Sequence, residues 1–298
     1  MSWVVFALIA AFLVACSDVI DKFIVERYTK NAGAIIIFFG IMNLGYSVGI
    51  FLLFKVKLEF SFTAIIAIIT GSMLALSSIT RFVALVKEEV SRISPLFATT
   101  PLVIAVLAAF LLNESFSYFT YIGIAFIIAG AFLLSFRIEK GIPKALPVLG
   151  IVFIGILLLG MQGVGSSWVR TSFDIWTFIS YNSLGYAMTA LPLVLFGNYG
   201  KEFLNVFVKN PRALGSLFFE EIFSVTGVSI LYYAFGLGPP TLVATLYSLK
   251  MFFVFLIATL VAIKGGNILR EGPKGQAIFL KAAAIALIFV GVYLLTAL

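Results

Sequence analysis

Long apolar stretches alternate with short polar connections along the whole chain. A helix needs about 20 mostly apolar residues to cross the hydrocarbon core of a bilayer. Ten stretches meet this requirement, and they predict helices at 3–22, 33–54, 62–86, 91–112, 118–136, 146–168, 175–196, 215–236, 239–263 and 277–297. The predicted fold class is therefore an all-α integral membrane protein with ten transmembrane helices.

The composition supports a membrane protein and excludes several kinds of site. Of the 298 residues, 62% are hydrophobic and only 11% are charged, which is too few charges to cover a soluble domain. The net charge is +7, but the basic residues lie in the short connections, so we expect membrane lipid as a partner and no nucleic acid. The chain has no histidine and one cysteine, Cys16, which excludes a histidine relay, a Ser-His-Asp triad and a disulfide framework.

A basic connection divides the chain into two similar halves. Residues 138–145 separate 1–137 from 146–298, and each half holds five predicted helices. An odd number of helices places the second half upside down relative to the first, as in many secondary transporters. A shift of about 150 residues also aligns 84–114 with 234–264 without a gap and brings Leu96 onto Leu246. The sequence thus predicts two inverted five-helix repeats.

Basic residues gather on one side of the predicted membrane. The regions at and after the first, third, fifth, seventh and ninth helices hold fifteen lysines and arginines, whereas the opposite side holds only Lys55, Lys57 and Arg170. The positive-inside rule predicts that the basic side faces the cytoplasm and that both termini lie outside.

Apart from Arg92 and Lys281, which are counted above with the basic side, seven ionisable residues fall inside predicted spans, where each costs about 2.5–3.5 kcal/mol at mid-helix and so indicates a functional site. They are Asp18, Asp21, Lys22, Arg81, Glu220, Glu221 and Lys250. Six lie in the half of the membrane nearest the basic side, with Lys250 below them near the bilayer centre, which predicts a polar vestibule. We expect Lys250 and Arg81 to contact an anionic group of a substrate, and the other five to balance charge or couple transport.

Two structural alternatives to that role stay open. Asp18 and Lys22 are four residues apart and could pair along one helix. Arg81 could form a static pair with Glu220 or Glu221 that holds two helices together.

Uncharged polar residues inside the spans extend the predicted substrate site. These are Tyr247, Asn43, Gln162, Tyr181 and Asn182, although hydrogen bonds between helices could also account for each of them. Gly45 and Gly49 form a small-xxx-small pattern, as do glycines of the predicted sixth helix, and both patterns predict close helix packing.

One segment carries a family resemblance. From Ala84 the chain reads ALVKEEVSRISPLFATTPLVIAVLAAFLLNE and later YIGIAFIIAGAFLL, with Pro95, Glu114, Gly123 and Gly130 at characteristic places. This segment resembles the first repeat of the EamA family in the drug/metabolite transporter superfamily. Asp21-Lys22 and the run TLYSLK at 245–250 resemble the related sugar-phosphate and nucleotide-sugar branch.

The resemblance implies ten helices in two inverted repeats, a central cavity and alternating access. It also implies that both termini are cytoplasmic, the opposite of what the charge count predicts, so the orientation stays open.

These observations predict a secondary transporter and not an enzyme. The expected substrate is a small polar organic metabolite, such as an amino acid or another carboxylate-bearing solute. The alternatives are a sugar-phosphate or nucleotide-sugar antiporter and a flippase for a lipid-linked substrate. No Walker A, dinucleotide-binding, HExxH or CxxC motif is present, so we expect no cofactor. The expected location is the cytoplasmic membrane of a prokaryote, and a homodimer is left open.

Overall fold

The computed structural model describes residues 2–111, 117–134, 136–139, 142–145, 147–265, 283–284, 286–291 and 293–294. Glu114 and much of the predicted tenth helix lie outside these residues. Within them, seven helices are long and apolar enough to cross a membrane, and two shorter apolar helices run over Thr100–Leu111 and Tyr118–Gly130. The multi-pass, largely helical architecture is confirmed, whereas the count of ten spans stays a prediction.

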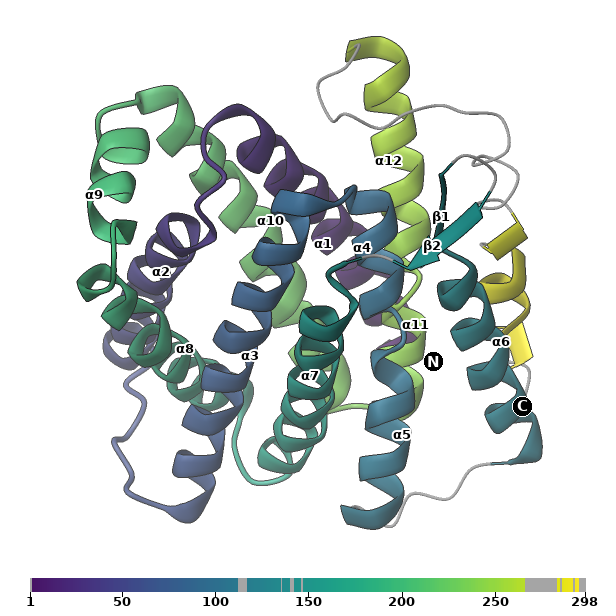
Figure 1. The fold of residues 1–298 in the computed structure, drawn as a ribbon. Helices are drawn as coiled ribbons and strands as arrows, with labels where there is room; N and C mark the ends of the chain where they lie inside the picture. Colours follow the sequence, from purple (N-terminus) through teal and green to yellow (C-terminus); the bar gives the residue numbers. More distant parts are fainter. Residues whose placement is uncertain are drawn as a thin grey trace.

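The elements follow the predicted order (Figure 1). They are α1 (Ser2–Arg27), α2 (Ala32–Leu53), α3 (Phe62–Lys87), α4 (Val90–Phe97), α5 (Thr100–Leu111), α6 (Tyr118–Leu134), β1 (Phe136–Glu139), β2 (Ile142–Ala145), α7 (Leu149–Arg170), α8 (Ile175–Ala190), η1 (Leu191–Leu195), α9 (Tyr199–Phe203), η2 (Leu204–Val208), α10 (Pro211–Phe235), α11 (Pro240–Tyr247) and α12 (Lys250–Gly265). The connection predicted as a loop contains a short antiparallel pair, β1 with β2.

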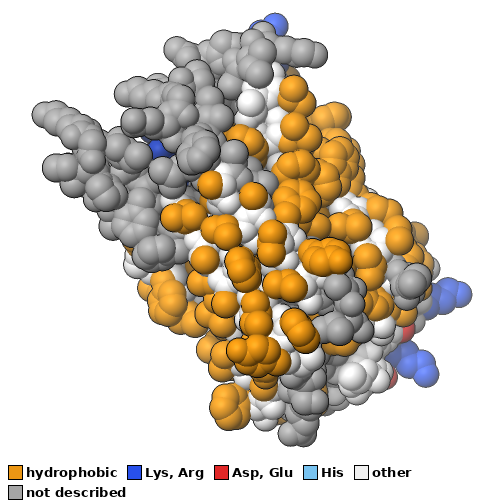
Figure 2. Space-filling view, turned by 90° about the vertical axis from the view of Figure 1, so that its right-hand side faces the viewer, with side chains coloured by type: hydrophobic (Ala, Val, Ile, Leu, Met, Phe, Trp, Pro, Cys, Tyr) orange, Lys and Arg blue, Asp and Glu red, His pale blue; other side chains and the backbone are white. Residues whose placement is uncertain are grey.

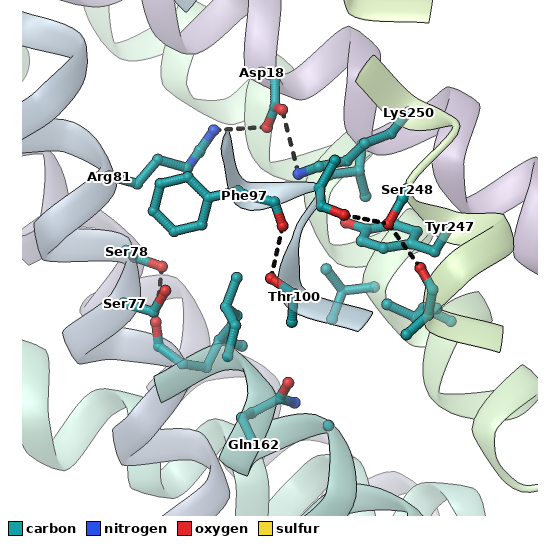
Figure 3. Close-up of a pocket in the computed structure, with 18 of the residues that line it drawn as sticks. Asp18, Ser77, Ser78, Arg81, Phe97, Thr100, Gln162, Tyr247, Ser248 and Lys250 are labelled. Atoms are coloured by element: carbon teal, nitrogen blue, oxygen red, sulfur yellow. Dashed lines mark hydrogen bonds and ion pairs between the residues drawn. The ribbon is translucent and has the colours of Figure 1, made fainter. Parts of the chain in front are cut away.

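The helices in the predicted fourth and ninth spans are each interrupted by two residues, 98–99 and 248–249. The stretch Pro240–Val261 as a whole is still long and apolar enough to cross a membrane. In the first half, Pro101 has no N–H to donate to the carbonyl of Phe97, and the hydroxyl of Thr100 donates to that carbonyl instead at 2.6 Å. In the second half the break falls at Ser248, whose hydroxyl donates to the carbonyl of Ala98 at 3.1 Å. The two breaks therefore touch each other in the middle of the molecule (Figure 3).

The two interrupted helices have equivalent boundaries. α4 and α11 begin at Val90 and Pro240, and α5 and α12 begin at Thr100 and Lys250. Each pair is separated by 150 positions, which is the shift that aligned the two halves of the sequence.

Close backbone contacts hold α3 against α8. A Cβ added to Gly71 would lie 1.8 Å from the carbonyl oxygen of Asn182, and one added to Gly185 would lie 1.9 Å from that of Ile68. Only glycine permits this approach. The packing predicted for Gly45 and Gly49 was wrong, because an added Cβ at either position would meet no atom within 4 Å.

The outer surface is suited to lipid tails. On the face that Figure 2 shows, hydrophobic side chains cover much of the described surface. Phe110 and Tyr118 are 81% and 77% exposed, an exposure that favours a hydrocarbon environment over water.

Candidate functional site

Asp18 of α1 is the centre of a buried charged cluster (Figure 3). Arg81 Nη1 of α3 lies 2.6 Å from Asp18 Oδ1, and Lys250 Nζ of α12 lies 3.3 Å from Asp18 Oδ2. The hydroxyl of Ser94, from α4, donates to Oδ2 at 3.0 Å, and Arg81 also pairs with Asp21. Four helices from both halves of the chain therefore meet at these side chains.

Local structure explains how these groups reach one another. Asp18 and Asp21 are three residues apart on α1, so their side chains share one face of the helix and one guanidinium spans both. Lys250 is the first residue of α12, directly after the break, and its ammonium lies 5.3 Å from the ring centre of Tyr247. The interruption of the helix thus places a cation in the interior of the molecule.

Both structural alternatives considered from the sequence are wrong. Lys22 does not pair with Asp18; its ammonium lies 2.9 Å from Glu26 and donates to the carbonyls of Leu85 and Glu88 at 2.8 Å. These acceptors lie at the carboxyl end of α3, where a cation is favourable. Lys22 therefore connects α1 to the carboxyl end of α3 through hydrogen bonds. It lines neither of the cavities described below.

Arg81 is paired with the two aspartates and not with the glutamates. In the part of the chain that the structure describes, no ion pair joins Glu220 or Glu221 to a basic residue.

A first cavity of about 140 Å³ borders the charged cluster. Asp18, Arg81, Tyr247 and Lys250 line it, together with apolar side chains and the polar groups of Ser17, Ser77, Ser78, Thr100, Gln162, Ser224, Tyr232 and Ser248. A mostly apolar cavity with a few converging polar groups is the usual form of a small-molecule site.

A second cavity of about 290 Å³ adjoins the first. The two share Ser78, Arg81, Ser224 and Tyr232. The second is lined in addition by Asn43, Tyr46, Asn182, Glu220 and Glu221 and by the aromatic residues Phe39, Phe82, Trp176 and Tyr186. The cavities are therefore two adjoining parts of one interior space, mostly apolar with polar and charged groups converging on it.

A buried hydrogen-bond network borders both cavities and joins four helices. Gln162 donates to the hydroxyl of Tyr232 at 3.0 Å, and that hydroxyl donates to Asn182 at 3.1 Å. Asn182 in turn donates to the hydroxyl of Thr70 at 3.0 Å. Two of the predicted polar residues, Gln162 and Asn182, are thus brought into one network. Each donates a hydrogen bond to a side chain of another helix.

Tyr181 lies away from this interior. Its hydroxyl accepts from the backbone N–H of Glu59 at 2.7 Å and donates to the carbonyl of Glu59 at 3.1 Å. It fixes the connection between α2 and α3 and lines neither cavity, so the structure does not bring it to the substrate site where the sequence analysis placed it.

Several residues of the site were not predicted. Serine and threonine are common in apolar helices, so nothing in the sequence singled out Ser94 within α4 or Thr100 and Ser248 beside the two breaks. Tyr232 is buried whereas its neighbour Tyr233 is 41% exposed. No sequence signal distinguishes the two tyrosines, since only packing decides which face of α10 points inward.

Comparisons with known proteins agree with the first half of the chain and with the overall fold. Residues 1–136 match the model of the EamA-like transporter family, which belongs to the drug/metabolite transporter superfamily. No curated protein matches the chain. One solved crystal structure has 18% sequence identity and a TM-score of 0.58, and the match covers 99% of this chain and 96% of that one. At this identity the likeness concerns the fold alone.

Proposed function

Because residues 1–136 carry the sequence of the EamA-like transporter family, we propose that this membrane protein is a secondary active transporter of small carboxylate-bearing metabolites. It would work as an exporter or exchanger, by alternating access between two inverted repeats. The observation that supports this most directly is the Asp18–Lys250 contact at the border of the first cavity. An ammonium group that is buried beside an open space is costly unless it has a partner there.

Asp18 acts in this proposal as the internal substitute for a substrate carboxylate. Its ion pair with Lys250 is the longer of its two, 3.3 Å against 2.6 Å for Arg81. A substrate carboxylate that enters the first cavity takes over Lys250, while Asp18 keeps Arg81 and the hydroxyl of Ser94. The empty cluster is neutral, with Arg81 and Lys250 against Asp18 and Asp21, and the loaded cluster is neutral when one proton enters with the carboxylate.

The charge of the cluster favours a carboxylate over a phosphate. Arg81 and Lys250 are matched by Asp18 and Asp21, so the cluster has no surplus positive charge for a dianion. A sugar-phosphate or nucleotide-sugar substrate would need such a surplus.

The helix breaks support an alternating-access mechanism. They occupy positions 150 residues apart and touch through Ser248 and the carbonyl of Ala98. Interrupted helices at the interface of two repeats are where transporters place substrate and allow one repeat to rock against the other.

Transport by the purified protein in proteoliposomes tests the proposal. Vesicles loaded with one unlabelled metabolite are diluted into each of a panel of labelled amino acids, other carboxylates, sugar phosphates and nucleotide sugars. We expect counterflow of at least one carboxylate, its loss in Lys250→Met, and full activity in Lys57→Met, which removes an exposed loop lysine. Movement of a lipid-linked probe without any water-soluble solute would support the flippase alternative and refute this proposal.

A further inference from the structure

Two neighbouring glutamates lie close to the charged cluster but form no ion pair with its basic residues. Glu220 and Glu221 of α10 are 1% and 3% exposed, and both line the second cavity. Arg81 and Lys250 are already matched by two aspartates, and Lys22 is matched by Glu26. Among the described residues that line the second cavity, Arg81 is the one basic residue, and it is paired with Asp18 and Asp21, so the two glutamates give the cavity an acidic character.

One carboxylate oxygen of Glu220 receives no hydrogen bond. The hydroxyl of Ser17 donates to Glu220 Oε1 at 2.6 Å, but Glu220 Oε2 is buried and has no hydrogen-bond partner. A buried carboxylate oxygen is costly unless a donor satisfies it. This orphaned acceptor belongs to a residue that lines a cavity, so a hydrogen-bond donor on a ligand in that cavity would satisfy it.

The rest of the cavity wall suits an organic cation. Phe39, Tyr46, Phe82, Trp176 and Tyr186 line the same space, and the negative faces of aromatic rings attract ammonium groups. Arg81 Cζ already lies 5.1 Å from the ring centre of Phe82, which shows this attraction at the border of the cavity. A space of about 290 Å³ with aromatic walls is larger and more apolar than a bare metal ion or a proton requires.

We propose that the second cavity is a subsite for an organic ammonium group, either a protonated amine or a quaternary amine, held by Glu220 and Glu221 among aromatic side chains. The subsite extends the proposed function, on which it rests for its place in a transport cycle. Arg81 and Ser78 border both cavities, so one substrate can place its carboxylate at Lys250 and its ammonium group at the glutamates. The transported solutes are then zwitterions that carry both groups, and not simple carboxylates.

Calorimetric titration of the full-length protein in detergent micelles tests the subsite without any transport. Two cationic probes are compared with neutral compounds of similar shape: butylammonium with butan-1-ol, and choline with 3,3-dimethylbutan-1-ol. We expect at least one cation to bind about tenfold or more tightly than its neutral counterpart. Glu220→Gln and Glu221→Gln should each weaken that binding by about tenfold to a hundredfold, which is the usual effect of removing a charged hydrogen-bond partner.

The control is Glu202→Gln, which removes a carboxylate that accepts from the hydroxyl of Thr29 and lines neither cavity. It should bind the probes as the wild type does. Equal affinity for cations and neutral compounds in the wild-type protein would overturn the proposal, and this comparison needs no variant to fold. Cation binding that survives in both folded glutamine variants would overturn it as well.

The outcomes separate this proposal from the transport proposal. Cation binding that depends on the glutamates, in a protein that carries no solute in proteoliposomes, would support the subsite and refute transport. Counterflow of carboxylates by a protein that does not prefer cations would support transport and refute the subsite. Glutamine variants that change only the pH profile of that counterflow would identify the glutamates as proton carriers, which also refutes the subsite.

Discussion

The clearest energetic prediction concerns the unequal roles of the two cations that share Asp18. Arg81 is the only described cation that pairs with Asp21, and it also makes the shorter pair with Asp18. Arg81→Met would leave Asp21 buried without a positive partner. Removing one partner of a buried ion pair costs about 3–5 kcal/mol, and we expect a loss of this size in the free energy of unfolding.

Lys250→Met should be much milder. It removes a 3.3 Å contact, but it also removes the cost of burying an ammonium group, and Asp18 keeps Arg81 and the hydroxyl of Ser94. A net hydrogen bond is worth about 0.5–1.5 kcal/mol, so we expect a loss of at most about 1.5 kcal/mol. The protein should fold and yet fail to bind the carboxylate that Lys250 is proposed to hold.

Equilibrium unfolding in mixed micelles, followed by the loss of helical signal, measures both variants on the same scale. A double variant, Arg81→Met with Asp21→Asn, supplies the control, because neutralising the stranded carboxylate should recover part of the loss. The reasoning is refuted if Lys250→Met destabilises the protein as much as Arg81→Met does. It is also refuted if the Asp21→Asn change recovers nothing.

Three further predictions test the packing, a helix cap and the topology. Gly185→Ala should destabilise the protein by about 1–3 kcal/mol or more, since the added Cβ would lie 1.9 Å from the carbonyl oxygen of Ile68. Gly45→Ala should be neutral or stabilising, because no atom lies within 4 Å of its added Cβ. Equal effects of the two variants in thermal unfolding would contradict this prediction. Asp174→Ala should cost about 1 kcal/mol, because the carboxylate accepts from the N–H of Trp176 at 2.9 Å and caps α8. Partial burial raises the pKa of the Asp174 carboxyl, but hydrogen bonds from Thr177 and Trp176 outweigh it and lower that pKa. The stabilisation by this cap should therefore be present at neutral pH and should fade as pH falls below about 4. A cost of Asp174→Ala that does not change with pH would contradict this prediction. A cysteine placed at 137–144 in a Cys16→Ala background should resist impermeant thiol reagents in intact cells if the basic side is cytoplasmic, and rapid labelling from outside would restore the orientation that the family resemblance implies.

Apolar run length determined much of the fold from the sequence alone. Ten runs of membrane-spanning length leave the chain few alternatives to a helical bundle, because an unpaired backbone group in hydrocarbon is too costly. The structure confirms helices at the described parts of these runs. The cost of charge in the membrane was equally informative, since it singled out Asp18, Arg81 and Lys250, and the structure places these three in contact.

Tertiary structure alone decided how the charges pair and where the cavities lie. The sequence allowed Asp18 to pair with Lys22, but the carbonyls at the end of α3 draw Lys22 away, and Arg81 takes its place. The break before Lys250 was also hidden, because an interruption of two residues leaves an apolar run unchanged in composition; the break before Thr100 has a local signal in Pro101. Which partner a buried charge meets depends on the rotation and depth of several helices at once. Hydropathy along one chain measures how apolar each helix is, and it contains no information about the neighbour that each face will meet.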